Sequence, residues 1–211
     1  MNLQTRQNQL FKRLQPLLNE AVNELGKDTR HYVSWHETSR LHEGNLTFHV
    51  GRQLEEDGFH YYTEVPVARP ETETGKGNFF DALALTPDLK SGIIIESKYF
   101  FSGTVTHLNK DLKRMLREKP LDRLQCLKDY QIDTGMILVH TWRQEILEWW
   151  DGGYQGAELP KRKRVKSAWA PIRHVLLNGL SDSGVITDCG NCWMMWAIFP
   201  LECLKEIWPE P

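Results

Sequence analysis

The sequence predicts an α/β protein in which helices flank a mixed central β-sheet, with a further helix at the N-terminus and β-rich additions at the C-terminus. Stretches of helical periodicity alternate along the chain with short apolar runs that are typical of strands. The 211 residues include eight Trp, eight Phe and six Tyr, enough for a sizeable core. We expect a single domain with an accessory N-terminal helix (residues 1–30), a core (34–142) and a C-terminal extension of the sheet (143–211).

The N-terminal segment carries two helical patterns. Leucines recur at helical spacing over residues 3–25, and Gly26 is expected to end that helix. The residues Ser34-Trp-His-Glu37 form a capping-box pattern that predicts the start of a second helix. This second helix is expected to stop at Gly58.

Three strands are predicted next, over residues 59–67, 78–85 and 92–100, because each is rich in aromatic and branched side chains. The last two are separated by Thr86-Pro-Asp-Leu-Lys-Ser, which has the composition of a turn. These two strands are therefore expected to form a hairpin.

The second half of the chain continues the alternation. Residues 105–130 have helical periodicity with a break at Pro120. Residues 134–142 form an apolar run that predicts a buried strand, and residues 172–177 and 193–199 predict two more.

The composition also excludes some classes of protein. The longest apolar run, Cys192–Leu201, is well short of the about 20 residues that a membrane helix needs. The first 30 residues lack the basic-then-apolar order of a signal peptide, and four cysteines in a chain of this length indicate a reducing compartment. We therefore expect a cytoplasmic protein with no membrane partner. Cys189 and Cys192 have metal-ligand spacing, but one such pair favours structural cysteines without excluding a metal site.

The hairpin carries the residues with the clearest chemistry. Residues two apart in a strand share a face, so Glu96 and Lys98 project together, with Ile94 behind them and Ser97 facing the other way. Asp81 lies on the neighbouring strand, where its carboxylate can converge with Glu96 if the register allows. Two carboxylates and an ammonium are costly to bury together unless a cation neutralises them, and carboxylate oxygens suit Mg²⁺ or Mn²⁺.

This arrangement of an acid, a hairpin and then acid–any–lysine resembles the signature of the PD-(D/E)XK nuclease superfamily, which has the restriction-endonuclease-like fold. Asp81, Glu96 and Lys98 match the signature, and residues 34–142 match the αβββαβ order of its core. The resemblance implies that Asp81 and Glu96 hold Mg²⁺ together with the main-chain carbonyl of Ser97, and that Lys98 assists the attacking water. It further implies hydrolysis of a phosphodiester, most often in DNA.

Some positions near the signature need separate interpretation. Phe80 stands where the family often has proline. Many members add a glutamate from the helix before the sheet, for which Glu43 is our candidate; Glu37 competes with it, but a capping role already explains Glu37. Glu64 and Asp88 are weaker choices for the first acid, because one lies in the preceding strand and the other in the turn.

The charge distribution is uneven along the chain. Residues 105–174 carry a net charge of +5, although the whole chain carries −2. Basic side chains in this segment can neutralise phosphates without reading sequence. The expected nucleic-acid contacts are Lys110, Lys113, Arg114 and Arg117 in the helical stretch and Lys161, Arg162, Lys163 and Arg164 in the loop over 151–168.

We therefore expect a Mg²⁺- or Mn²⁺-dependent nuclease that acts on DNA, with RNA as the alternative substrate. Two other hypotheses remain. One is a nucleic-acid-binding or assembly subunit on the same fold that is inactive or needs a partner to cut. The other is an unrelated α/β interaction module in which the acid–any–lysine triplet is coincidental. A homodimer or a larger nucleoprotein assembly is compatible with the aromatic segment after residue 190.

Overall fold

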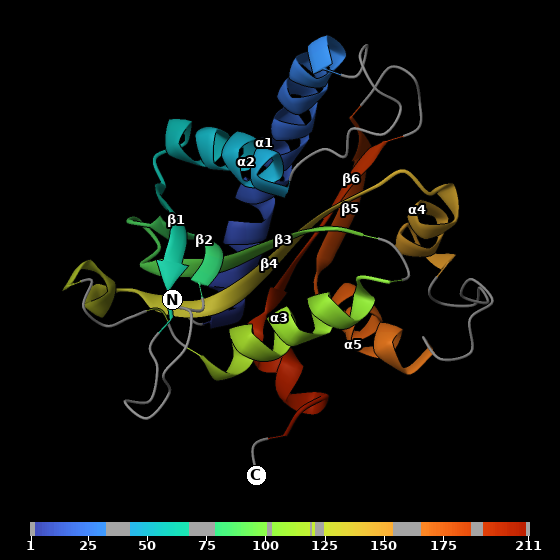
Figure 1. Ribbon diagram of the computed structural model, residues 1–211. Helices are drawn as coiled ribbons and strands as arrows, with labels where there is room; N and C mark the ends of the chain where they lie inside the picture. Colours follow the sequence, from blue (N-terminus) through green and yellow to red (C-terminus); the bar gives the residue numbers. More distant parts are fainter. Residues whose placement is uncertain are drawn as a thin grey trace.

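A six-stranded mixed β-sheet forms the centre of the molecule (Figure 1). The computed structural model describes residues 3–32, 43–67, 79–100, 103–118, 120, 125–153, 166–186 and 192–209. The strands lie in the order β1-β2-β3-β4-β6-β5, and each neighbouring pair is antiparallel except β3 and β4, which are parallel. Their bounds are β1 (His60–Pro66), β2 (Phe79–Thr86), β3 (Ser91–Tyr99), β4 (Gln131–Thr141), β5 (Leu180–Val185) and β6 (Trp193–Pro200).

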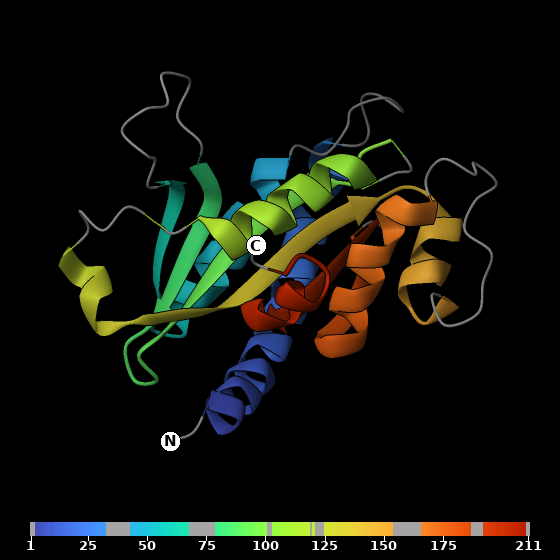
Figure 2. The ribbon, with the colours of Figure 1, turned by 90° about the horizontal axis from the view of Figure 1, so that it is seen from below.

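Helices cover both faces of this sheet, which confirms the predicted α/β class. Helices α1 and α2 pack on one face and close an apolar core there. Helices α3, α4 and α5 pack on the other face over a second core. Figure 2 shows α3, α5 and a short 3₁₀ segment, η4, in front of the sheet. The bounds are α1 (Leu3–Tyr32), α2 (Glu43–Glu56), α3 (Val105–Arg117), η1 (Gln125–Asp129), α4 (Gln144–Trp150), α5 (Lys166–Asn178) and η4 (Leu201–Glu206).

Strand β3 is buried from Ser91 to Ser97 because the sheet is covered on both sides. Its side chains alternate as predicted. Ile93 and Ile95 belong to the core under α1 and α2, and Ile94 belongs to the core under α3 and α5. Glu96 and Lys98 have the parity of Ile94, so they leave the strand on the α3 side.

The predicted hairpin of β2 and β3 is confirmed, and its register decides the position of Asp81. The ladder runs from Thr86 opposite Ser91 to Ala82 opposite Ile95. Beyond that pair β3 continues along β4 as far as Tyr99. The register therefore brings Asp81 next to Glu96 at the point where the β2–β3 pairing ends.

The first helix extends further than the sequence pattern suggested. The prediction that Gly26 ends it is wrong, because α1 continues to Tyr32. Gly26 instead permits close packing, since a Cβ at this position would lie 2.6 Å from the main-chain oxygen of Ile186. The second helix is described from Glu43, and the capping-box residues Ser34–Glu37 lie outside the described residues.

The predicted strand over residues 172–177 is wrong, because these residues lie within helix α5. Trp169, Ile172 and Leu176 are buried at helical spacings of three and four, which the short apolar run alone did not reveal. The C-terminal extension is therefore mixed, since α4 and α5 accompany β5 and β6.

The break predicted at Pro120 is confirmed, because α3 ends at Arg117 and Pro120 makes an isolated bridge to Val67. The described residues that follow form only the 3₁₀ segment η1. Within the described ranges, no helix combines the length and apolar character needed to cross a membrane.

Candidate functional site

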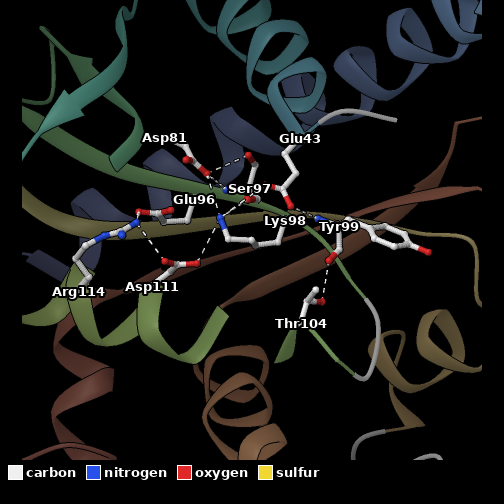
Figure 3. Close-up of polar contacts among 9 residues, drawn as sticks. All are labelled: Glu43, Asp81, Glu96, Ser97, Lys98, Tyr99, Thr104, Asp111 and Arg114. Atoms are coloured by element: carbon white, nitrogen blue, oxygen red, sulfur yellow. Dashed lines mark hydrogen bonds and ion pairs between the residues drawn. The ribbon is translucent and has the colours of Figure 1, made fainter. Parts of the chain in front are cut away.

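Side chains from four elements meet at the end of β3, where β2 separates from it (Figure 3). α2 begins on one side of this point, and α3 passes on the other. The residues that meet are Glu43 of α2, Asp81 of β2, Glu96, Ser97 and Lys98 of β3, and Asp111 and Arg114 of α3. We call these seven residues the fork site.

Asp81 joins the two separating strands. Its Oδ2 atom accepts a hydrogen bond from the Ser97 N–H at 2.7 Å and another from the Ser97 Oγ at 3.1 Å. About a third of the Asp81 side chain remains exposed. The carboxylate therefore fixes the strand end and still faces solvent.

Lys98 occupies the middle of the fork site. Its Nζ donates to the main-chain carbonyl of Ser97 at 3.0 Å. The same Nζ lies 3.5 Å from Asp111 Oδ2 and 3.8 Å from both Asp81 Oδ2 and Glu43 Oε2. Oxygen atoms thus surround a single positive charge at this point.

The protonation state of Lys98 follows from these contacts. Burial alone would lower the pKa of its ammonium, but the surrounding carboxylates, that of Asp111 first among them, raise the pKa above its ordinary value. Lys98 is therefore a cation at neutral pH.

Glu96 is the most deeply buried member of the site, with no exposed surface. Its Oε1 accepts a hydrogen bond from Arg114, whereas its Oε2 has no hydrogen-bond partner within the described part of the chain. Burial, followed by the charges of Asp81 and Asp111, raises the pKa of Glu96 to about 8 in spite of Arg114. Arg114 alone therefore does not supply enough positive charge to keep this buried carboxyl group ionised at neutral pH.

Asp111 was missed by the sequence analysis, although its position gave a signal. It lies on the face of α3 that also buries Leu108, Leu112 and Met115, so its carboxylate interrupts an apolar stripe. Its Oδ1 lies 3.2 Å from Arg114 Nη2, and burial raises the pKa of its carboxyl group. A charged residue on the buried face of an amphipathic helix needs a partner from the sheet beneath it.

Glu43, predicted as the helix-borne glutamate, reaches the site from the first turn of α2. Its Oε1 accepts a hydrogen bond from the Tyr99 N–H at 2.9 Å, and its Oε2 faces Lys98. It therefore ties α2 to the end of β3.

The donor atoms of the fork site suit a hard divalent cation. The four carboxyl groups of the fork site outnumber its two cations, and Glu96 Oε2 is a buried oxygen without a hydrogen-bond partner in the described part of the chain. The Lys98 ammonium lies among oxygens of the kind that bind Mg²⁺. Lys98 and Arg114 keep the carboxylates apart, and in the described ranges no three His, Cys, Asp or Glu side chains are grouped closely enough to hold an ion as they stand.

The predicted phosphate contacts divide into three groups. Lys110, Lys113 and Arg117 are exposed on α3, and the Lys113 Nζ lies 5.2 Å from the ring centroid of Trp208. Arg114 instead points inward to Glu96 and Asp111. The remaining group, residues 161–164, lies outside the described residues.

Of the two cysteines with metal-ligand spacing, Cys189 lies outside the described residues. Cys192 is buried in the core under α1 and α2. Burial raises the pKa of its thiol to about 12, so it stays protonated at neutral pH.

A hollow of about 670 Å³ lies between α2 and β1 and reaches the α2 side of the fork site. Of the fork site, Glu43, Asp81 and Ser97 line this hollow, together with Phe48 and Tyr61. Phe48 is 63% exposed, so the hollow opens to solvent beside an aromatic ring.

No protein-family model, no curated protein and no solved structure matches this chain.

Proposed function

We propose that the protein is a Mg²⁺- or Mn²⁺-dependent nuclease that hydrolyses phosphodiester bonds in DNA. The observation that carries the proposal is the meeting of Asp81 and Glu96, from neighbouring strands, with Lys98 and the Ser97 carbonyl. These are the residues on which the resemblance to the PD-(D/E)XK superfamily depends, and the α/β sheet around them is compatible with that fold.

In this proposal the metal ligands are Asp81, Glu96 and the carbonyl oxygen of Ser97. A bound Mg²⁺ would lower the pKa of its water and so supply hydroxide near neutral pH. The carboxylates of the fork site outnumber its cations even while Glu96 keeps its proton, which favours binding of a further cation, and carboxylate oxygens suit a divalent one.

Lys98 would act through its positive charge. Because neighbouring carboxylates raise its pKa, its ammonium stays protonated and is suited to stabilise the negative charge that develops on the phosphate oxygens. Glu43 is a positioning residue in this scheme, since its hydrogen bond to the Tyr99 N–H holds the strand end that carries Lys98.

The exposed cations of α3 are suited to the substrate backbone. Lys110, Lys113 and Arg117 follow one another at spacings of three and four, so they lie along one side of the helix. Such a row would neutralise phosphates without distinguishing base sequence.

The test is incubation of purified protein with supercoiled plasmid and with single-stranded circular DNA, in Mg²⁺, in Mn²⁺ and in EDTA. We expect metal-dependent cleavage that falls at least about a hundredfold in Asp81→Ala and in Lys98→Ala. Asp88→Ala is the matched control, because Asp88 lies in the turn at the other end of the hairpin, paired with Arg13.

Two results would overturn the proposal. Binding of DNA without cleavage under every metal would support a nucleic-acid-binding subunit, an alternative favoured by the position of Lys98 and Arg114 between the carboxylates. Neither cleavage nor salt-sensitive binding would support an unrelated interaction module.

A further inference from the structure

We propose that Asp111 and Arg114 of α3 are positioning residues of the fork site: Asp111 holds Lys98 and Arg114 holds Glu96. This inference rests on the nuclease function proposed above, and it assigns part of the site to a helix that contributes neither of the proposed metal-binding carboxylates. Arg114, which the sequence analysis interpreted as a phosphate contact, takes a different role here.

The four side chains form a chain of alternating charge, which we call the charge chain (Figure 3). Lys98 Nζ lies 3.5 Å from Asp111 Oδ2, and Asp111 Oδ1 lies 3.2 Å from Arg114 Nη2. Arg114 Nη2 in turn donates to Glu96 Oε1. The chain therefore begins and ends on β3 and passes through α3.

The spacing of the residues makes this closure possible. Glu96 and Lys98 are two apart on a strand, so they project from the same face about 7 Å apart. Asp111 and Arg114 are three apart on a helix, so they lie on the same side one turn apart. One turn of α3 is thus matched to one side-chain repeat of β3.

Burial indicates that the charge chain serves more than the docking of α3. Leu108, Leu112 and Met115 already pack the helix into the core. A buried ion pair is often no more stable than apolar residues of similar size, because its charges lose their hydration. Asp111 nevertheless lies on the buried face, 7% exposed. One charged neighbour of Asp111, Lys98, is a proposed catalytic residue. The other, Arg114, holds the proposed metal ligand Glu96.

The consequences of losing either residue differ. Within the described residues, Arg114 provides the hydrogen bond that Glu96 Oε1 accepts, so its loss frees the side chain of a proposed metal ligand. Loss of Asp111 removes the carboxylate nearest to Lys98 Nζ and leaves those of Asp81 and Glu43 at 3.8 Å. A displacement of about 1 Å in a catalytic group can cost about a hundredfold in rate.

The test is the single-turnover rate of cleavage of a labelled oligonucleotide in Mg²⁺, with the Kd for the same oligonucleotide measured by fluorescence anisotropy in Ca²⁺. We expect Asp111→Asn to lower the rate about 10- to 100-fold and to leave the Kd unchanged. We expect Arg114→Lys to retain more activity than Arg114→Met, because only the lysine keeps a positive charge beside Glu96.

Asp133→Asn is the matched control. Asp133 forms a partly buried pair with Arg6 away from the fork site, so this variant should unfold more easily in urea and still cleave at the wild-type rate below its melting temperature. A structural role for the charge chain would give Asp111→Asn the same behaviour. If Asp111→Asn does not fold, the comparison of Arg114→Lys with Arg114→Met decides, since equal rates overturn the inference.

The outcomes separate this inference from the function on which it rests. A wild-type protein that cuts no DNA in any metal overturns the proposed function and the inference with it. A wild-type protein that cuts, together with folded Asp111→Asn and Arg114→Met variants that cut equally fast, overturns the inference alone.

Discussion

Two clusters of charged side chains lie at opposite ends of the central strands, and they are built differently. At the end where β3 begins, Arg6 and Arg13 of α1 pair with Asp133 and with Asp57 and Asp88. Each aspartate in that cluster has an arginine partner. We call it the α1 cluster, and at the other end of β3 lies the fork site.

The difference lies in how completely the carboxylates are neutralised. Both oxygens of Asp133 are used, since Oδ2 accepts from Arg6 and Oδ1 accepts from Ser91 Oγ at 3.3 Å and Thr134 Oγ1 at 3.0 Å. In the fork site Glu96 Oε2 is buried without a hydrogen-bond partner in the described part of the chain. The fully bonded Asp133 carboxylate fastens α1 to the sheet, whereas the unpaired Glu96 oxygen leaves a place for a further positive charge.

The two clusters should respond in opposite ways when an aspartate is replaced by asparagine. Asp133→Asn should cost about 1–3 kcal/mol of unfolding free energy, because it leaves Arg6 without its charged partner, and should leave cleavage unchanged. Asp81→Asn should abolish cleavage without loss of stability, since it removes one of several crowded negative charges and its amide oxygen can still accept from Ser97. Urea unfolding and plasmid cleavage measure both quantities. Loss of stability in both variants would mean that the two clusters do not differ in kind.

The two clusters should also differ in how protein stability depends on pH. The pKa of Glu96 is raised from 4.5 to about 8, so between these values the folded protein keeps a proton that the unfolded chain has released. The contribution of this group to stability therefore falls as the pH rises through that range and levels off above it. The side chain introduced by Glu96→Gln carries no charge, so the stability of this variant should not show this decrease.

The measurement is urea unfolding in EDTA at a series of pH values. Glu96→Gln should match the wild type near the lower end of the range and be more stable above about pH 8. A constant difference in unfolding free energy at every pH would show that burial does not raise the pKa of Glu96. Asp133→Asn serves as the reference from the α1 cluster.

The smallest expected effect concerns the exposed cations of α3. Lys110→Ala should weaken oligonucleotide binding by only a few fold and lower the slope of log K against log salt by about 1. Lys12→Ala is the control, because Lys12 is exposed on α1, which covers the other face of the sheet. Equal salt slopes for the two variants would show that α3 is not part of the nucleic-acid-binding surface.

Much of the sheet could be predicted because strands carry a period of two that the sequence displays directly. The alternation of Ile93, Ile94 and Ile95 correctly predicted the facing of Glu96 and Lys98. The turn residues correctly predicted the hairpin that brings Asp81 to them. These features are local, so the sequence pattern contains them.

Other features depend on packing between distant segments. Gly26 looked like a helix end because glycine commonly follows one, yet it marks the close approach of α1 to Ile186. The run over 172–177 was too short to distinguish a strand from a helix, and only Trp169 before it extends the helical spacing. The role of Asp111 needed the position of α3 over β3, although its place on an apolar helix face was readable.

The bond from the Ser97 N–H to Asp81 Oδ2 provides an internal spectroscopic reporter. In the nuclease proposal, that oxygen belongs to a metal ligand, so an arriving ion would draw electron density away from the amide's acceptor. The nitrogen-15 and proton chemical shifts of Ser97 should then move during a titration with Mg²⁺, before any nucleic acid is added. A single backbone resonance would thus follow occupancy of the site independently of turnover.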